Sequence, residues 1–421
     1  MTEDFLHYIW QYRLYDTDLY LRTGEAVEVL QPGLHNTDSG PDFFNARIRI
    51  GDTIWAGNIE IHIQSSDWKR HNHLQDRSYD NVILHVVWRD DMQILRTDKS
   101  VIPTLELDGH YNENSWKSYL SFMASTKWIP CDTLIARVDR FRLNSWLDRV
   151  LVERLERKAL EVEHVLSITN NDWAHTFYRL LARNMGFKLN TQAFSMLAQS
   201  LPYQFLAKHS DDLYQIESMV FGQAGLLEGS FADDYPLKLK KEYGFLKKKF
   251  NLNPVDAHLW RFMRLHPGNF PTLRLAQFAS IVHQSKSLIG ELFDSNDVNV
   301  YRKLFGAQAS EYWNTHYSFD KPSAPRKKTL GQSSVELLLI NLVAPILLTY
   351  GKRKSNADLT EKPLELLLQL KGENNSIIRK WSELGLDVSN AAQTQALLEL
   401  KAKYCDAKKC LNCSIGNELL K

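Results

Sequence analysis

The sequence predicts an α+β protein, with a small N-terminal α/β domain on a mixed sheet followed by a large all-α region. Strand-like alternation is concentrated in the first ~110 residues. Helical periodicity dominates from Val138 onward, and no sustained alternation returns. The chain has 421 residues, which is too long for a single hydrophobic core of ordinary size. We therefore expect two domains, residues 1–125 and residues 126–421.

The N-terminal domain is expected to open with an amphipathic helix over residues 3–14, because Phe5, Ile9 and Tyr12 recur at helical spacing. Alternation and β-rich composition then predict strands over residues 25–30, 43–50, 53–64 and 81–88. Gly51-Asp52 joins the second and third strands as a hairpin turn. Polar residues 65–79 predict a loop with a short helix, so the expected order is α-β-β-β-α-β.

The helical region is expected to form several hairpins separated by proline and glycine. Its most apolar stretch, residues 335–350, is interrupted by Glu336, Asn341 and Pro345 and is shorter than the roughly 20 apolar residues of a membrane span. We expect a buried core helix there. The N-terminus lacks a signal-peptide pattern, and four cysteines are too few for a disulfide framework. The expected location is the cytoplasm, without a membrane partner.

The most informative segment is residues 58–64, where isoleucines alternate with polar residues. On a strand, Glu60, His62 and Gln64 share one face, about 7 Å apart, while the isoleucines face the core. Asp42 precedes the neighbouring strand, and the hairpin can bring it beside Glu60. Two carboxylates that close repel each other and favour a divalent cation.

These residues resemble the PD-(D/E)XK nuclease superfamily: Pro41-Asp42, then 17 residues, then Glu60-Ile61-His62, in an α-β-β-β-α-β order. The resemblance implies a restriction-endonuclease-like domain in which Asp42 and Glu60 bind Mg²⁺ or Mn²⁺. His62 stands where that superfamily has lysine, and it could act as a base or a ligand. Gln75 and Tyr79 resemble the Gln-x-x-x-Tyr element of RecB-like members.

The segment after this strand also permits a different site. His71 and His73, with Asp76 and His85 nearby, could form a histidine-rich transition-metal site together with Glu60 or His62. A solvated polar loop is the ordinary interpretation of His71 and His73. His85 alternates with apolar residues, which is equally typical of a hydrogen-bonded core histidine.

Cysteines form the second cluster. Cys405, Cys410 and Cys413 make a C-x4-C-x2-C set, and Cys131 is the only other cysteine. Together they fit a four-thiolate site for Zn²⁺ or a [4Fe-4S] cluster, which the spacing does not distinguish. The four cysteines resemble those of some RecB-like nucleases, in which an iron-sulfur cluster is bound by one remote cysteine and three C-terminal ones. Because the site would close a loop of about 270 residues, its loss is expected to loosen the helical region.

Over its whole length the chain resembles a bacterial family catalogued as domain of unknown function 2851. The residues that carry the resemblance are Gly40-Pro41-Asp42-Phe43, Glu60-Ile61-His62, Asp67-Trp68, His71 to His73, Phe221-Gly222-Gln223-Ala224-Gly225, Asn269-Phe270-Pro271 and Cys410-Leu411-Asn412-Cys413. The resemblance to this family implies no particular activity.

The function expected from these observations is metal-dependent phosphodiester hydrolysis, with a nucleic acid as partner. Asp42 and Glu60 would hold Mg²⁺ or Mn²⁺, His62 and Gln64 would orient water, and the helical region would clamp DNA or RNA. The alternative is an inactive nucleic-acid-binding or assembly protein that kept the fold without the lysine. A carboxylate pair within reach of one ion would favour the enzyme.

Overall fold

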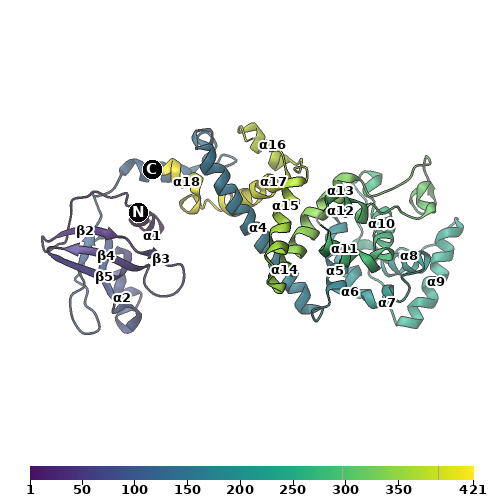
Figure 1. Cartoon of the computed structure of the whole chain (residues 1–421), viewed down its shortest axis with the longest axis horizontal. Helices are drawn as coiled ribbons and strands as arrows, with labels where there is room; N and C mark the ends of the chain where they lie inside the picture. The colour runs from purple at the N-terminus through teal and green to yellow at the C-terminus, as the bar shows by residue number, and fades with distance from the viewer. Residues whose placement is uncertain (296, 387) are drawn as a thin grey trace. The chain divides into compact units, whose positions relative to one another are not determined.

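The computed structural model describes residues 1–295, 297–386 and 388–421. It is an α+β structure with an N-terminal mixed sheet and a large helical part (Figure 1). The chain forms two compact units, Met1–Trp146 with Leu400–Lys421, and Leu147–Glu399. A compact unit is not by itself a folding domain, so the boundary at residues 125 and 126 stays a prediction.

A mixed sheet is the centre of the first unit. Its elements in chain order are α1 (Glu3–Tyr12), β1 (Leu19–Tyr20), β2 (Ala26–Gln31), β3 (Leu34–His35), β4 (Phe43–Ile50), β5 (Thr53–Gln64), α2 (Asp67–Arg70), β6 (Val82–Arg89), β7 (Thr104–Glu106) and α3 (Glu113–Ala124). The sheet order is β1-β2-β4-β5-β6-β7, and β3 pairs with β4. Strands β2, β4 and β5 are antiparallel, whereas β6 runs parallel to β5 and β7 parallel to β6.

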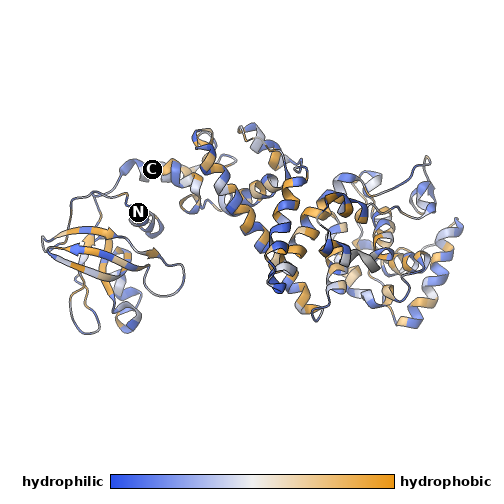
Figure 2. Cartoon of the chain, viewed as in Figure 1, coloured by the Kyte–Doolittle hydropathy of each residue, from blue (hydrophilic) through white to orange (hydrophobic). Residues whose placement is uncertain are grey.

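Both faces of the sheet are covered, which explains why β5 is buried over most of its second half. Ile59 and Ile61 belong to a core that also contains Phe5 and Ile9 of α1. A smaller apolar cluster contains Trp68 of α2. Figure 2 shows that the strands carry both hydrophobic and hydrophilic residues. The polar face of β5 is therefore enclosed at Glu60 and His62, whereas Gln64 at the end of the strand is exposed.

The C-terminal segment returns to the first unit. It contains a π-helix (Leu400–Cys405), a 3₁₀ turn (Cys410–Asn412) and α18 (Ser414–Leu420). Tyr8 donates a hydrogen bond to the carbonyl oxygen of Asn417 over 3.3 Å, and the Asn417 amide donates to the Tyr12 hydroxyl over 2.9 Å. Cys410 and Leu420 lie in the same core as α1. Residues about 400 positions apart in sequence thus share one core.

The second unit is mainly helical. It includes most of α4 (Arg140–Ile168), then α5 (Trp173–Met185), α6 (Thr191–Ser200), α7 (Tyr203–Ala207), α8 (Leu213–Gln223), α9 (Asp234–Phe250), α10 (Pro271–His283), α11 (Ser285–Asp294), α12 (Val298–Phe305), α13 (Gln332–Leu338), α14 (Ala344–Lys354), α15 (Ala357–Gln369), α16 (Ser376–Glu383) and α17 (Ala391–Glu399). A short hairpin, β8 (His316–Ser318) with β9 (Lys321–Pro322), interrupts them.

The stretch predicted as a core helix lies in one long helix, Gln332–Lys354, in which a π-helix (Leu339–Val343) links α13 to α14. Within the described residues it is the one helix long and apolar enough for a membrane span, and 72% of its most apolar window is buried inside the structure. That burial agrees with the expectation of a core helix.

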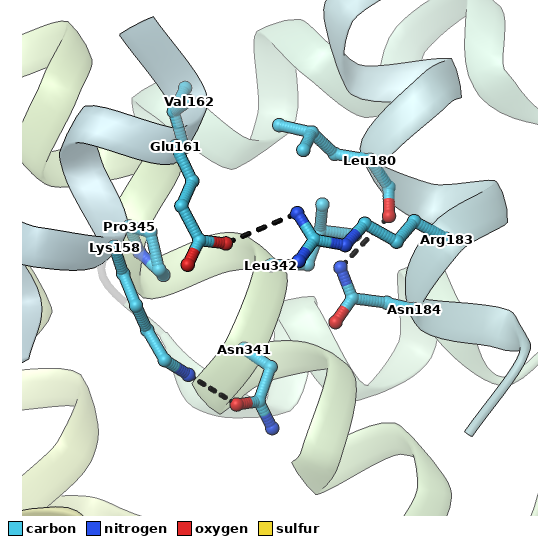
Figure 3. A pocket seen from close by; sticks show the side chains of 9 residues that line it. All are labelled: Lys158, Glu161, Val162, Leu180, Arg183, Asn184, Asn341, Leu342 and Pro345. Atoms are coloured by element: carbon cyan, nitrogen blue, oxygen red, sulfur yellow. Dashed lines mark hydrogen bonds and ion pairs between the residues drawn. The ribbon is translucent and has the colours of Figure 1, made fainter. Parts of the chain in front are cut away.

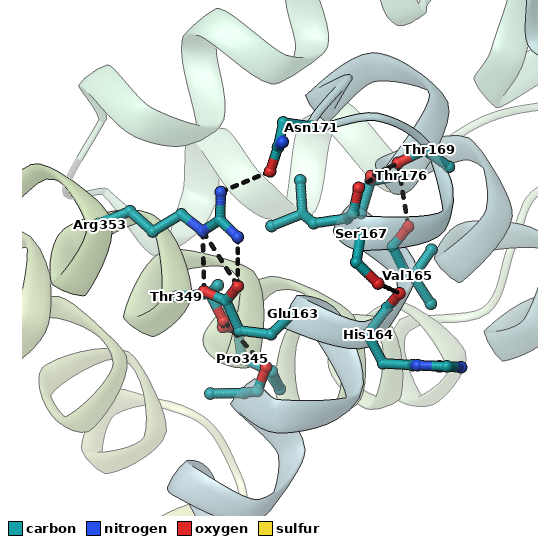
Figure 4. A network of polar contacts seen from close by, with 12 residues as sticks. Glu163, His164, Val165, Ser167, Thr169, Asn171, Thr176, Pro345, Thr349 and Arg353 are labelled. Carbon is teal, nitrogen blue, oxygen red and sulfur yellow. Dashed lines mark hydrogen bonds and ion pairs between the residues drawn. The ribbon is translucent and has the colours of Figure 1, made fainter.

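Polar side chains connect α4 to α14 within this unit (Figure 4). The guanidinium of Arg353 contacts both carboxylate oxygens of Glu163 and donates to Asn171 over 2.6 Å. Further along α4, Thr169 and Thr176 share a buried hydrogen bond of 2.6 Å between their hydroxyls. Because the threonine pair is buried, it fixes the start of α5 against the end of α4.

Glu399, the last residue of α17, is a buried carboxylate held by two arginines of α4. Its oxygens accept from Arg154 over 2.9 Å and from Arg157 over 2.7 and 2.8 Å, and it is 3% exposed. Burial raises the pKa of Glu399, but the hydrogen bonds from Arg157 and Arg154 outweigh burial and lower the pKa below its ordinary 4.5. The charged pair is therefore favoured at neutral pH.

We expect Glu399→Gln to destabilise the second unit by about 2 kcal/mol, because it removes the counter-charge of the half-buried guanidinium groups of Arg154 and Arg157. The loss should be complete above the ordinary pKa of 4.5 and should fade as the pH falls through the lower folded value. Urea unfolding at pH 7 and pH 4 measures both. Glu156→Gln is the control, since its ion pair with Lys352 is exposed. Equal stability of the two variants would contradict this assignment.

Candidate carboxylate and histidine site

Asp42 and Glu60 meet where β4 begins beside β5. The peptide N–H of Asp42 donates to Glu60 Oε2 over 3.2 Å, and Asp42 Oδ2 accepts from the peptide N–H of Ile61 over 2.8 Å. A register shift in the β4–β5 ladder between Phe43 and Ala46 accompanies this approach. The structure therefore brings together the two acidic residues that the sequence pattern paired across the hairpin.

The second carboxylate oxygen of Glu60, Oε1, faces two histidines. Glu60 Oε1 lies 3.1 Å from His73 Nε2 and 3.5 Å from His62 Nε2. His62 Nε2 in turn lies 3.1 Å from His71 Nδ1. One ligand atom from each of the three histidines lies within 4.8 Å of the others, and among the described residues they are the one such group. These four side chains could hold a metal ion.

Two aromatic residues and one further histidine hold this group in place. His85 Nε2 is hydrogen-bonded to His62 Nδ1 over 2.8 Å. Tyr79 stacks on His73 with ring centroids 3.8 Å apart, and Trp68 lies edge-on to His73 at 5.3 Å. His85 is completely buried, as expected for a hydrogen-bonded core histidine. Its contact fixes the orientation of the His62 ring.

Burial controls the charges of these groups. Desolvation, followed by the Asp42 charge, raises the pKa of Glu60 to about 9. Desolvation and the neighbouring histidines lower the pKa of His62 to about 2, and desolvation and His73 lower that of His85 to about 3. His62 is thus a neutral imidazole at pH 7. It does not supply the positive charge of a lysine at that position.

Two of the predicted side chains lie outside the group. Gln64 is exposed, and its peptide N–H donates to Asp67 over 3.1 Å. Gln75 is exposed as well. The short helix expected within residues 65–79 is α2, and Gln75 and Tyr79 lie after it, in two 3₁₀ turns separated by Asp76 in an extended conformation. The Asp76 carboxylate accepts from the Ser78 N–H over 2.9 Å, and this local bond competes with the helix.

Sequence reasoning missed the contribution of α1. His7 Nε2 lies 3.3 Å from Asp42 Oδ2. Burial lowers the pKa of His7, but the hydrogen bond and charge of Asp42, with the charges of Glu3 and Asp4, give a net rise. Glu3 lies one turn before His7, and its pKa is raised mainly by burial. The i,i+4 spacing of Glu3 and His7 indicated a shared helix face, but no local pattern connected that face to Asp42.

The four cysteines also come together in the first unit. All four are free thiols, and Cys410 and Cys413 are buried. The pKa of Cys131 is raised to about 12 by burial and by the proximity of Cys413 and Cys410. Burial and the other three thiols likewise raise the pKa of Cys405. The backbone of Gly416 approaches Cys410 so closely that an added Cβ would lie 2.1 Å from the Cys410 oxygen.

A family model described as "Protein of unknown function (DUF2851)" matches residues 3–376. The chain belongs to the DUF2851 family. The match includes the carboxylates and histidines described above, and it ends before Cys405. No curated protein and no solved structure matches the chain.

A separate polar cavity of about 210 Å³ lies in the second unit of this DUF2851 protein (Figure 3). Glu161 and Arg183 form an ion pair of 3.1 Å at its wall, and Lys158 donates to the Asn341 side chain. Burial, followed by the charge of Arg154, lowers the pKa of Lys158 to about 7. A lysine that is half neutral at pH 7 can act as a base. No sequence pattern pointed to this cavity.

Proposed function

We propose that this protein is a metal-dependent phosphodiesterase acting on DNA or RNA. The observation that carries the proposal is the meeting of Asp42 and Glu60 across β4 and β5, with imidazoles on the free side of Glu60. Carboxylates and neutral imidazoles bind divalent cations, and these groups are held by paired strands. When bound, a divalent ion polarises a phosphoryl oxygen and activates water.

The order and direction of the elements support the same proposal. Helix α1 is followed by the antiparallel strands β2, β4 and β5, then by α2 and by β6 parallel to β5. This order resembles the α-β-β-β-α-β arrangement of the PD-(D/E)XK superfamily, with Asp42 before the second of these strands and Glu60 in the third. We therefore propose a restriction-endonuclease-like core for the first unit.

His7 fills the role left by the missing lysine in this proposal. In the superfamily pattern the lysine at the position of His62 supplies positive charge, whereas His62 here is neutral and is 1% exposed. His7 has a raised pKa beside Asp42, so it carries more positive charge near pH 7 than an ordinary histidine. It is a donor for the phosphate, while Asp42 fixes its position.

We propose in addition that the four cysteines hold one [4Fe-4S] cluster. Zinc would draw four sulfurs to about 3.8 Å from one another, given a bond of about 2.3 Å. Among the described residues, no three of the cysteine sulfurs all lie within 4.8 Å of one another, which is a wider arrangement than zinc requires. A four-iron cluster accepts four thiolates at a wider separation.

The test of the phosphodiesterase is cleavage of end-labelled single-stranded and double-stranded DNA and RNA with Mg²⁺, Mn²⁺ or Zn²⁺. Asp42→Asn should lower the rate by about 100-fold or more, because it removes one carboxylate charge from the site. Asp38→Asn, at an exposed loop position, is the control. Wild-type cleavage by Asp42→Asn would overturn the proposal. Binding of nucleic acid without any cleavage would favour the inactive binding protein instead.

A further inference from the structure

We infer that Glu60, His62, His71 and His73 form a site for one divalent first-row transition metal ion, in place of a magnesium site between Asp42 and Glu60. This inference deepens the proposed function and rests on it only for what the ion does. The binding itself follows from the side chains, whether or not the protein cleaves phosphodiesters.

Three of the separations between ligand atoms match a four-coordinate site. The three histidine nitrogens lie within 4.8 Å of one another, and Glu60 lies close to two of those histidines, His62 and His73. Metal-to-ligand bonds of about 2.0 to 2.1 Å place tetrahedral ligands about 3.3 Å apart. The distances found are 3.1 Å from Glu60 Oε1 to His73 Nε2, 3.5 Å from Glu60 Oε1 to His62 Nε2, and 3.1 Å from His62 Nε2 to His71 Nδ1. All three are close to the tetrahedral value.

The contact between His73 and Glu60 is short but is not a hydrogen bond. His73 is 8% exposed, and its Nε2 has no hydrogen-bond partner among the described residues although Glu60 Oε1 is 3.1 Å away. A buried polar atom without a partner is costly, so the nitrogen of His73 and the facing oxygen of Glu60 are suited to share one ligand. An ion between them would satisfy both.

The residues behind the site are those that orient metal ligands. His85 is hydrogen-bonded to Nδ1 of His62, so Nε2 is the nitrogen of His62 that faces Glu60 and His71, and an ion there would replace the contact between His62 and His71. Tyr79 stacks on the ring of His73 and limits its rotation. His71 is exposed, so solvent reaches the group at this residue, and an ion and a substrate oxygen can enter there.

The donor set selects the class of ion. Three imidazole nitrogens with one carboxylate suit Zn²⁺, Mn²⁺, Fe²⁺ or Co²⁺, whereas Mg²⁺ prefers an all-oxygen octahedron that keeps several waters. Asp42 is drawn away from this set, because Oδ2 accepts from Ile61 and faces His7. A magnesium ion bridging Asp42 and Glu60 would compete with those contacts.

The test is the metal content of the full chain after it is loaded with Zn²⁺ or Mn²⁺ and dialysed. The wild type should retain one more ion per chain than His71→Ala or His73→Gln, and Mg²⁺ should not compete. His71→Ala is at an exposed position and should fold. His110→Ala, an exposed histidine elsewhere in the first unit, is the matched control and should retain the wild-type content.

Substitution with Co²⁺ separates this site from the cysteines. The ion lost in His71→Ala should show the visible bands of nitrogen and oxygen ligands without thiolate charge transfer. Equal metal content in the wild type and both variants would overturn the inference. Cleavage that needs only Mg²⁺ and survives both substitutions would also overturn it, and would leave the proposed function standing. An ion retained without cleavage would support this site and remove the proposed function.

Discussion

Replacing Glu60 with glutamine is expected to abolish metal-dependent cleavage and to leave the fold intact. Glu60 is the residue shared by the carboxylate pair and the histidine group, so the substitution removes a negative ligand from both. Partners behind a ligand already contribute 10- to 100-fold to affinity or activity, so the loss of the ligand itself should exceed about 100-fold. Glutamine keeps the oxygen that accepts from Asp42.

Thermal unfolding with and without metal checks this result independently of activity. Saturating Zn²⁺ or Mn²⁺ at about 100 times Kd should stabilise the wild type by about 2.7 kcal/mol and should not stabilise Glu60→Gln. In metal-free protein the two should be similar, since the raised pKa of Glu60 means that its side chain is already neutral at pH 7. Glu28→Gln, on an exposed part of β2, is the control. Full activity in Glu60→Gln would remove this residue from the site.

The second large effect is expected at the cysteines, where Cys410→Ser should loosen the first unit. Cys131 and Cys405 lie 274 positions apart in sequence, and a link across such a loop stabilises by up to about 5 kcal/mol. Cys410 also shares a core with α1, so the effect should reach the sheet. Hydrogen exchange should therefore quicken in residues 1–146 and 400–421.

From the spacing of the cysteines alone, loss of the four-thiolate site was expected to loosen the helical region. The structure places the C-terminal segment in the first unit, so the effect is now expected there. Cluster loss can be followed by iron content and visible absorption. Removing the cluster from the wild type should reproduce Cys410→Ser, and the same treatment should add nothing to the variant. A Cys410→Ser protein with wild-type exchange and no loss of iron or zinc would refute a shared four-thiolate site.

Much of the sheet could be predicted from local sequence patterns. Residues 43–50 and 53–64 form β4 and β5 with the predicted bounds, because the alternation and the Gly51-Asp52 turn act over short distances. The two-residue strands β1 and β3 were missed, since two residues carry no periodicity. Residues 93–95 also have a strand-like composition, but in the structure the segment forms one isolated bridge, between Leu95 and Val101.

The candidate site was predictable where strand geometry dictates it and not where loops supply its residues. Asp42, Glu60 and His62 follow from a hairpin and from alternation. The orientation of His71 toward His62 and of His73 toward Glu60 depends on turns after α2, in which Asn72 adopts a left-handed conformation with φ of 60°. His7 reaches Asp42 through the packing of α1 on β5, a long-range contact that no local pattern encodes.

The return of residues 400–421 to the first unit has a consequence for biosynthesis. Residues 147–399 leave the ribosome before Cys405, Cys410 and Cys413 are translated. The first unit can therefore be completed only after the whole helical unit has been synthesised. During that interval the core surface later covered by Cys410 and Leu420 is exposed. This surface is therefore a candidate binding site for chaperones during synthesis, and any cofactor on the four thiols is inserted only after translation of the last of them.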